Sequence, residues 1–124
     1  MADALVYVAG AVLIAWGTSH VAATRPVVES FGAIGVDNRR ILTMEWVAEG
    51  ITHVTIGLLV VLVAAVEGSD SGTADLVYRV LAAALVVFAG LTAATGSRTP
   101  VIWFKVCPFV LSGAAALLLV RTFI

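Results

Sequence analysis

Charged side chains are scarce in this sequence of 124 residues: they make up 12% of it, whereas a typical soluble domain carries about 25%. Seven Lys and Arg residues against eight Asp and Glu leave a formal net charge of −1 at pH 7, so there is no basic surface for nucleic acid. The single cysteine, Cys107, excludes an internal disulfide and a Cys-x-x-Cys redox pair. Nucleic-acid-binding proteins and disulfide scaffolds are therefore excluded.

Hydrophobic residues, in contrast, make up 61% of the chain. About 20 apolar residues in a helix cross a hydrocarbon core that is ~30 Å thick. Four stretches fit this length, approximately residues 4–24, 41–66, 76–95 and 101–120. The sequence therefore predicts an all-α integral membrane four-helix bundle, with residues 1–124 forming a single transmembrane domain in the lipid bilayer.

The first of these stretches could be mistaken for a signal peptide. Its leading residues, "MADAL", contain Asp3 and no Lys or Arg, so the positive n-region is missing and we expect a permanent helix. Pro26 is expected to end it.

The following loop, "RPVVESFGAIGVDNRR", places apolar residues at helical spacing and predicts a short interfacial helix within 25–40. Asp37 and Asn38 can cap the second span.

The distribution of basic residues predicts the orientation. Four of them lie in or beside the 25–40 and 96–99 loops, namely Arg25, Arg39, Arg40 and Arg98. Only Arg79 and Arg121 lie near the other side, and positively charged loops stay in the cytoplasm. Both termini are therefore expected to be extracytoplasmic in a multi-pass protein of the cell membrane.

Ionisable residues interrupt the second apolar stretch in "MEWVAEGITHV". At about 100° per residue, Glu45, Glu49 and His53 fall on one face of a helix. An ionisable side chain at the bilayer centre costs ~2.5–3.5 kcal/mol or more, so this face should turn towards protein or water. The sequence predicts a polar pocket that faces the cytoplasm, while the outer half of the bundle is expected to be almost wholly aliphatic.

Counting ~1.5 Å per residue from the inner edge suggests partners for these residues. Glu45, His20 and Lys105 lie about 7–8 Å deep, so these three are expected to meet. Glu49 lies ~13 Å deep, with Trp16 and Cys107 near its level. His53, at ~20 Å, has no ionisable neighbour at its level and lies ~12 Å deeper than His20. A backbone carbonyl or a threonine such as Thr52 or Thr55 is its expected hydrogen-bond partner.

Three interpretations of this polar group remain open. Glu45, Lys105 and His20 can simply fasten helices together. Glu49, with a second carboxylate one turn away, can be a proton-binding or ligand-binding site. A metal site is disfavoured, because di-metal bundles use Glu-x-x-His and this chain has none. Trp16, Trp46 and Trp103 fit an interfacial aromatic belt. No catalytic residue is predicted.

The segments "TRPVVESFG" and "DNRRILTMEWVAEG" resemble a group of small prokaryotic membrane proteins that is broadly similar to DoxX-like four-helix proteins. The resemblance covers the first hairpin and implies a four-helix bundle. Some DoxX-like proteins are associated with quinone-linked redox chemistry or membrane complexes. The resemblance carries no catalytic residue onto this chain and does not identify a cofactor.

Two main function classes follow. The first is a binding or transport module for a small molecule or protons, which we expect to form homo-oligomers in the membrane by its small-residue faces. Its candidate binding residues are Glu45, Glu49, His20, His53, Lys105 and Trp16. The second is an accessory or assembly subunit of a larger membrane complex. Quinone-linked redox chemistry is a further alternative, and enzymatic activity ranks below the first two.

Overall fold

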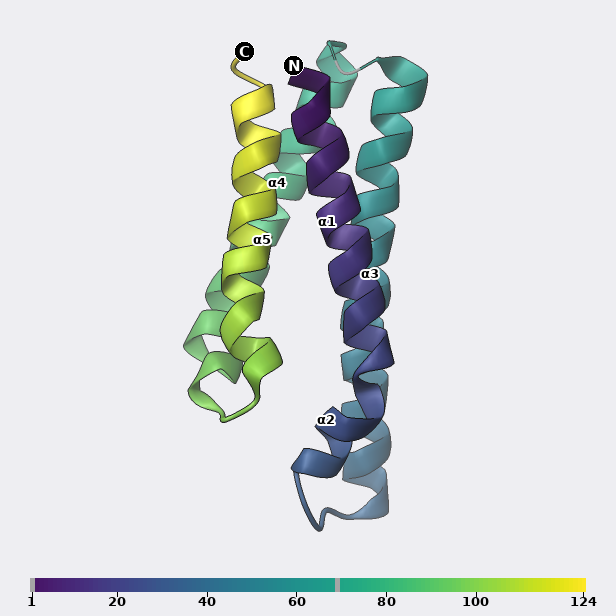
Figure 1. The fold of residues 1–124 in the computed structure, drawn as a ribbon, viewed down its shortest axis with the longest axis vertical. Coiled ribbons are helices and arrows are strands. Elements are labelled where there is room, and N and C mark those ends of the chain that lie inside the picture. The colour runs from purple at the N-terminus through teal and green to yellow at the C-terminus, as the bar shows by residue number, and fades with distance from the viewer. Residues whose placement is uncertain (1, 69) are drawn as a thin grey trace.

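The fold is built from helices alone. The computed structural model describes residues 2–68 and 70–124, and within these ranges it contains no strand. Four long helices run alternately up and down, namely α1 (Ala2–Ala22), α3 (Val36–Glu67), α4 (Gly72–Ala94) and α5 (Ile102–Arg121). Two short elements, α2 (Thr24–Ser30) and the 3₁₀ helix η1 (Gly96–Arg98), lie at the end away from both termini (Figure 1). The predicted all-α four-helix architecture is confirmed.

Each long helix is long and apolar enough to cross a bilayer. The four candidate spans are Asp3–Ala22, Val36–Glu67, Gly72–Arg98 and Ile102–Arg121. Large apolar side chains are exposed on their outer faces, including Leu62, Val87 and Phe109. Such surfaces are compatible with lipid and unfavourable in water. The chain is a multi-pass membrane protein.

Helix α3 begins five residues earlier than the predicted start at Ile41. Its N-cap is Gly35, and no side chain caps it, so the prediction that Asp37 and Asn38 cap this helix is wrong. Asp37 instead lies within the first turn, where its negative charge complements the helix dipole. The apolar run that begins at Ile41 covers only the part of α3 that suits the hydrocarbon core. The helix itself begins earlier and includes the polar residues before this run.

The predicted short helix in the 25–40 loop is confirmed as α2. Pro26 lies in its first turn, where the missing backbone N–H is tolerated. Val27 and Val28 are buried, while Phe31 follows the last helical residue and is 39% exposed. The apolar side of α2 thus closes against the end of the bundle.

Helices α1 and α3 approach each other closely along a glycine seam, formed by Gly10 and Gly17 on α1 and Gly50 and Gly57 on α3. A Cβ atom on Gly17 would overlap the carbonyl oxygen of Gly50, and one on Gly57 would lie 2.7 Å from the carbonyl oxygen of Gly10. Real Cβ atoms do not approach a backbone oxygen so closely, so this helix spacing requires glycine. Small residues allow the same close approach in membrane helix pairs generally.

The half of the bundle nearest the termini has a continuous core. All four long helices contribute fully buried side chains to it, including Leu13, Val60, Leu85, Leu111 and Leu118. Buried alanines lie between them, among them Ala9, Ala82, Ala114 and Ala115. These alanines let the helices pack without a gap at this end.

The expectation of an almost wholly aliphatic outer half holds for most of its core, and a few buried polar residues are the exceptions. Tyr78 is fully buried, and Arg121 is only 4% exposed. The Arg121 guanidinium donates a hydrogen bond to the carboxylate of Asp70, which is 94% exposed. The sequence places Arg121 at the end of its span, where a long side chain can reach back to the α3–α4 loop. This ion pair fastens the end of α5 to that loop.

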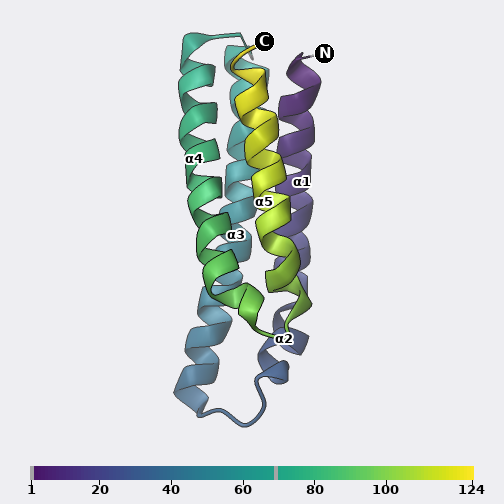
Figure 2. The same ribbon diagram turned by 90° about the vertical axis from the view of Figure 1, so that its left-hand side faces the viewer.

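The long helices form two helical pairs, α1 with α3 and α4 with α5. These pairs separate at the end of the bundle opposite the termini. Helices α4 and α5 end at η1, whereas α2 and the first turns of α3 continue beyond it (Figures 1 and 2). The α1–α3 pair stays close through its seam over the same region. The resulting gap between the pairs is where the cavity described below lies.

The glycine seam yields the first testable prediction. Gly17→Ala should lower the free energy of unfolding in detergent by about 1–3 kcal/mol or more, because the new methyl group must push α1 and α3 apart. Gly113→Ala in α5 is the matched control, since a Cβ there meets no atom within 4 Å. Thermal unfolding followed by circular dichroism measures both variants. Equal stability of the two would show that the seam is not tightly packed.

Candidate functional site

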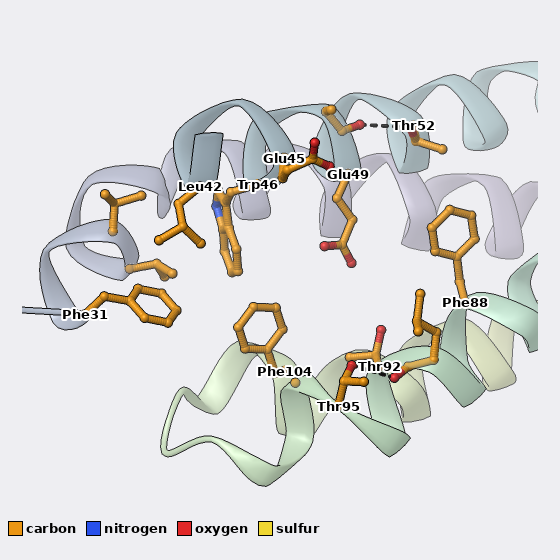
Figure 3. Close-up of a pocket in the computed structure, with 15 residues that line it drawn as sticks. Phe31, Leu42, Glu45, Trp46, Glu49, Thr52, Phe88, Thr92, Thr95 and Phe104 are labelled. Carbon is orange, nitrogen blue, oxygen red and sulfur yellow. Dashed lines mark hydrogen bonds between the residues drawn. The ribbon is translucent and has the colours of Figure 1, made fainter. Parts of the chain in front are cut away.

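A cavity of about 390 Å³ separates the two helical pairs. Helices α2 and α3 form one wall, and α4, η1 and α5 form the other (Figure 3). Four aromatic side chains line it, namely Phe31, Trp46, Phe88 and Phe104. Glu45 and Glu49 are its only charged lining residues within the described chain. The cavity is therefore mainly apolar, carries two carboxyl groups and has no cationic side chain in its lining.

Glu49 lies at the centre of this arrangement. Its side chain extends from α3 into the cavity, towards Thr92 and Phe104 (Figure 3). The side chain is 22% exposed, so a molecule in the cavity can reach the carboxyl group. One carboxyl oxygen lies 3.6 Å from Nε2 of His20, and the other accepts a hydrogen bond from the Cys107 thiol at 3.9 Å. The prediction that Cys107 neighbours Glu49 is confirmed.

His20 lies behind the cavity wall and is fully buried. Its imidazole stacks on the Trp46 indole, with ring centroids 3.7 Å apart and planes inclined by 14°. Trp46 also donates its indole N–H to the backbone carbonyl of His20 at 2.6 Å. This carbonyl is in the last turn of α1, where carbonyls lack partners within the helix. Trp46 thus fixes both the ring and the backbone of His20.

His53 is fully buried and lies on the inner side of α3. Its ring centroid is 6.1 Å from that of His20 and 5.9 Å from that of Phe88. The expectation that His53 has no ionisable neighbour, and lies ~12 Å deeper than His20, is therefore wrong. Neither ring nitrogen has a hydrogen-bond partner among the described residues.

The expected hydrogen bond between His53 and Thr52 or Thr55 is not formed. The hydroxyl groups of these threonines donate instead to the backbone carbonyls of Ala48 and Ile51 in their own helix.

The glycine seam explains why the two histidines meet. Gly17 faces Gly50 and Gly10 faces Gly57, which places His20 level with Val47 in α3. Val47 and His53 are six residues apart, an axial separation of about 9 Å. Each side chain leans towards the N-terminus of its own helix, and α1 and α3 are antiparallel, so the two rings lean towards each other. The depths estimated from the sequence were counted from the inner edge of each span, on the assumption that all the inner edges lie at one level. They did not include this lean of the side chains.

The predicted meeting of Glu45, His20 and Lys105 is wrong. His20 contacts Glu49 instead, one turn deeper than Glu45. Lys105 is exposed and forms no ion pair with any described residue. Glu45 is also exposed, and its carboxyl group extends less far into the cavity than that of Glu49 (Figure 3). The register of the seam pairs His20 with the later carboxylate.

Trp16, the remaining predicted site residue, lies beside His20 but does not line the cavity. Its ring centroid is 6.3 Å from that of His20 and 5.5 Å from that of Trp103. Its indole nitrogen is buried without a hydrogen-bond partner among the described residues. Trp16 therefore supports the back of the site from α1.

Sequence reasoning missed the role of Trp46, which was assigned to an aromatic belt. Its position three residues before Glu49 places it near the same helix face, and this spacing was the available signal. Phe88, Thr92 and Phe104 were missed as well. They come from the second hairpin, where no pattern distinguishes cavity residues from lipid-facing ones.

The arrangement of these residues does not form a metal site within the described chain. Within the described chain, no group of three or more His, Cys, Asp or Glu side chains is arranged to hold a metal ion. In comparisons with known proteins, no family model matches this chain, and no curated protein or solved structure matches it. The fold and cavity define a small polytopic membrane protein, and no family match supports the resemblance to DoxX-like proteins.

The exposed position of Lys105 leads to a prediction. Lys105→Ala and Lys105→Arg should unfold in detergent with free energies within ~0.5 kcal/mol of each other, because Lys105 makes no ion pair that alanine would remove. Chemical denaturation in a fixed detergent measures the difference. A clearly lower free energy of unfolding for the alanine variant would support the predicted pairing of Lys105 with Glu45.

Proposed function

We propose that this protein is a binding or transport module that takes an amphipathic cation into the cavity between its helical pairs. The observation that carries this proposal is the carboxyl group of Glu49, which extends into a cavity with aromatic residues in its walls and, among the described residues, no cationic side chain in its lining. A ligand that is both apolar and positively charged complements this lining.

The chemistry of the walls favours a cation over a neutral molecule. A cation over an aromatic face gains roughly 0.5–2 kcal/mol, and Phe88 and Phe104 line the cavity together with Glu49. A carboxylate attracts a cation more strongly in such surroundings than in water, since the effective dielectric constant is lower. Bulky apolar substituents on the cation can fill the space between the aliphatic and aromatic side chains.

A direct test uses tetraphenylphosphonium, a permanent cation with apolar substituents. It should bind the purified protein, and Glu49→Gln should weaken binding roughly 10- to 100-fold, corresponding to the ~1.5–3 kcal/mol of a charged contact. Equilibrium dialysis or calorimetry measures the affinity.

Two controls sharpen this test. Glu67→Gln removes a carboxyl group at the exposed end of the same helix and should leave the affinity unchanged. Tetraphenylborate has a similar shape and the opposite charge, and should bind at least tenfold more weakly. Equal binding of both ions, or unchanged binding by Glu49→Gln, would contradict the proposal.

The proposed orientation places the cavity near the cytoplasmic side. Arg25, Arg39, Arg40 and Arg98 are all exposed at the end of the bundle that carries α2 and η1. Basic residues flanking spans are retained in the cytoplasm, so this charge distribution supports extracytoplasmic termini.

This orientation predicts the behaviour of fusions to the C-terminus. Alkaline phosphatase, which needs an oxidising compartment, should be active there, whereas a fluorescent protein that matures only in the cytoplasm should stay dark. Both fusions are assayed in intact bacterial cells, with equal expression checked by immunoblot. The opposite pattern would reverse the assigned orientation.

A further inference from the structure

Two buried imidazoles stand behind the cavity without the hydrogen bonds that buried polar groups normally have. His20 and His53 are each 0% exposed, and none of their four ring nitrogens has a hydrogen-bond partner among the described residues. A neutral imidazole carries one donor and one acceptor, and burying either without a partner is unfavourable. Packing alone therefore does not account for the two histidines.

One of these nitrogens lies close to the cavity carboxylate. Nε2 of His20 is 3.6 Å from Oε2 of Glu49, within ion-pair distance when the imidazole is protonated. When the imidazole is protonated, the His20–Glu49 pair is neutral overall, because the carboxylate carries one negative charge and the imidazolium one positive charge. The indole face of Trp46, stacked on the same ring, can also interact favourably with a cationic imidazole.

Every helix packed around this pair contributes polar or ionisable groups near it. Helix α3 contributes Glu45 and His53, α5 contributes the Cys107 thiol, and α4 contributes the neutral Thr92. The basic side chains of α2, η1 and α5 nearest this end are exposed and form no ion pair with Glu49, namely Arg25, Arg98 and Lys105. Within the described chain, His20 is thus the only potential cation paired with Glu49.

We propose that the His20–Glu49 pair holds one exchangeable proton and releases it when a cation binds beside Glu49. This inference rests on the proposed cation site. A net charge in surroundings of low dielectric is costly, so the arrival of one positive charge favours the departure of another. The Nε2–H bond of the His20 imidazolium breaks, the electron pair stays on Nε2, and the proton passes to water. The bound cation then replaces the imidazolium as the partner of the Glu49 carboxylate.

The exchange is tested by counting protons. Tetraphenylphosphonium has no titratable group, so any proton released on binding comes from the protein. Calorimetric titrations at one pH, in buffers with different heats of ionisation, should show release approaching one proton per bound cation at some pH between about 5 and 8. Binding without proton release throughout this range overturns the exchange and leaves the cation site standing. No binding at any pH overturns both the proposed function and this inference.

Variants then assign the proton to its residue. His20→Gln removes the group that carries the proton, so release on binding should fall from nearly one proton per bound cation to nearly zero. His53→Gln is the matched control, because the second buried histidine has its ring centroid 6.1 Å from that of His20 and forms no ion pair with Glu49. This variant should still release nearly one proton per bound cation. Loss of proton release in the His53 variant alone, or in neither variant, overturns the assignment to His20. The wild-type proton count needs no variant, so it decides the exchange even if substitution at His20 prevents folding.

Discussion

The close contact between α1 and α3 is the constraint on which the rest of this structure depends. Backbone oxygens of one helix occupy the space that side chains would need on the other, at both glycine pairs of the seam. This contact fixes the separation and the register of the two helices together. A shift of one residue would bring side chains into backbone, so the register cannot slide. His20 is therefore held opposite Glu49 and within stacking distance of Trp46.

The cavity follows from an imbalance in packing along the bundle. Near the termini, a continuous core of Leu, Val and Ala side chains joins all four long helices, and the Arg121–Asp70 ion pair closes that end. At the other end, the α1–α3 pair remains close while α4 and α5 diverge from it (Figure 1). The bulky rings of Trp46, Phe88 and Phe104 line the resulting space without filling it. A closely packed outer half thus adjoins a more open inner half.

The polar residues of the site show how a membrane helix can carry ionisable groups. Glu49 avoids lipid by extending into the cavity, while His20 and His53 are enclosed between helices. Each lies where at least one other polar or aromatic group is within reach, as expected for costly residues in a bilayer. Trp46 links the two environments, because one part of its ring system lines the cavity and its face covers the His20 imidazole.

The sequence by itself determined the helices that cross the membrane and the face of α3 that carries Glu45, Glu49 and His53. Both depend on local properties, namely the length of apolar runs and the ~100° rotation per residue. The short helix α2 was also predictable, from the helical spacing of apolar residues in the 25–40 loop.

Only the tertiary structure decided which residues meet. The choice of Glu49 over Glu45 as the partner of His20, and the approach of His53, depend on the register and lean of two antiparallel helices. That register is set by four glycines far apart in sequence, whose lack of a side chain matters only once the partner backbone is in place.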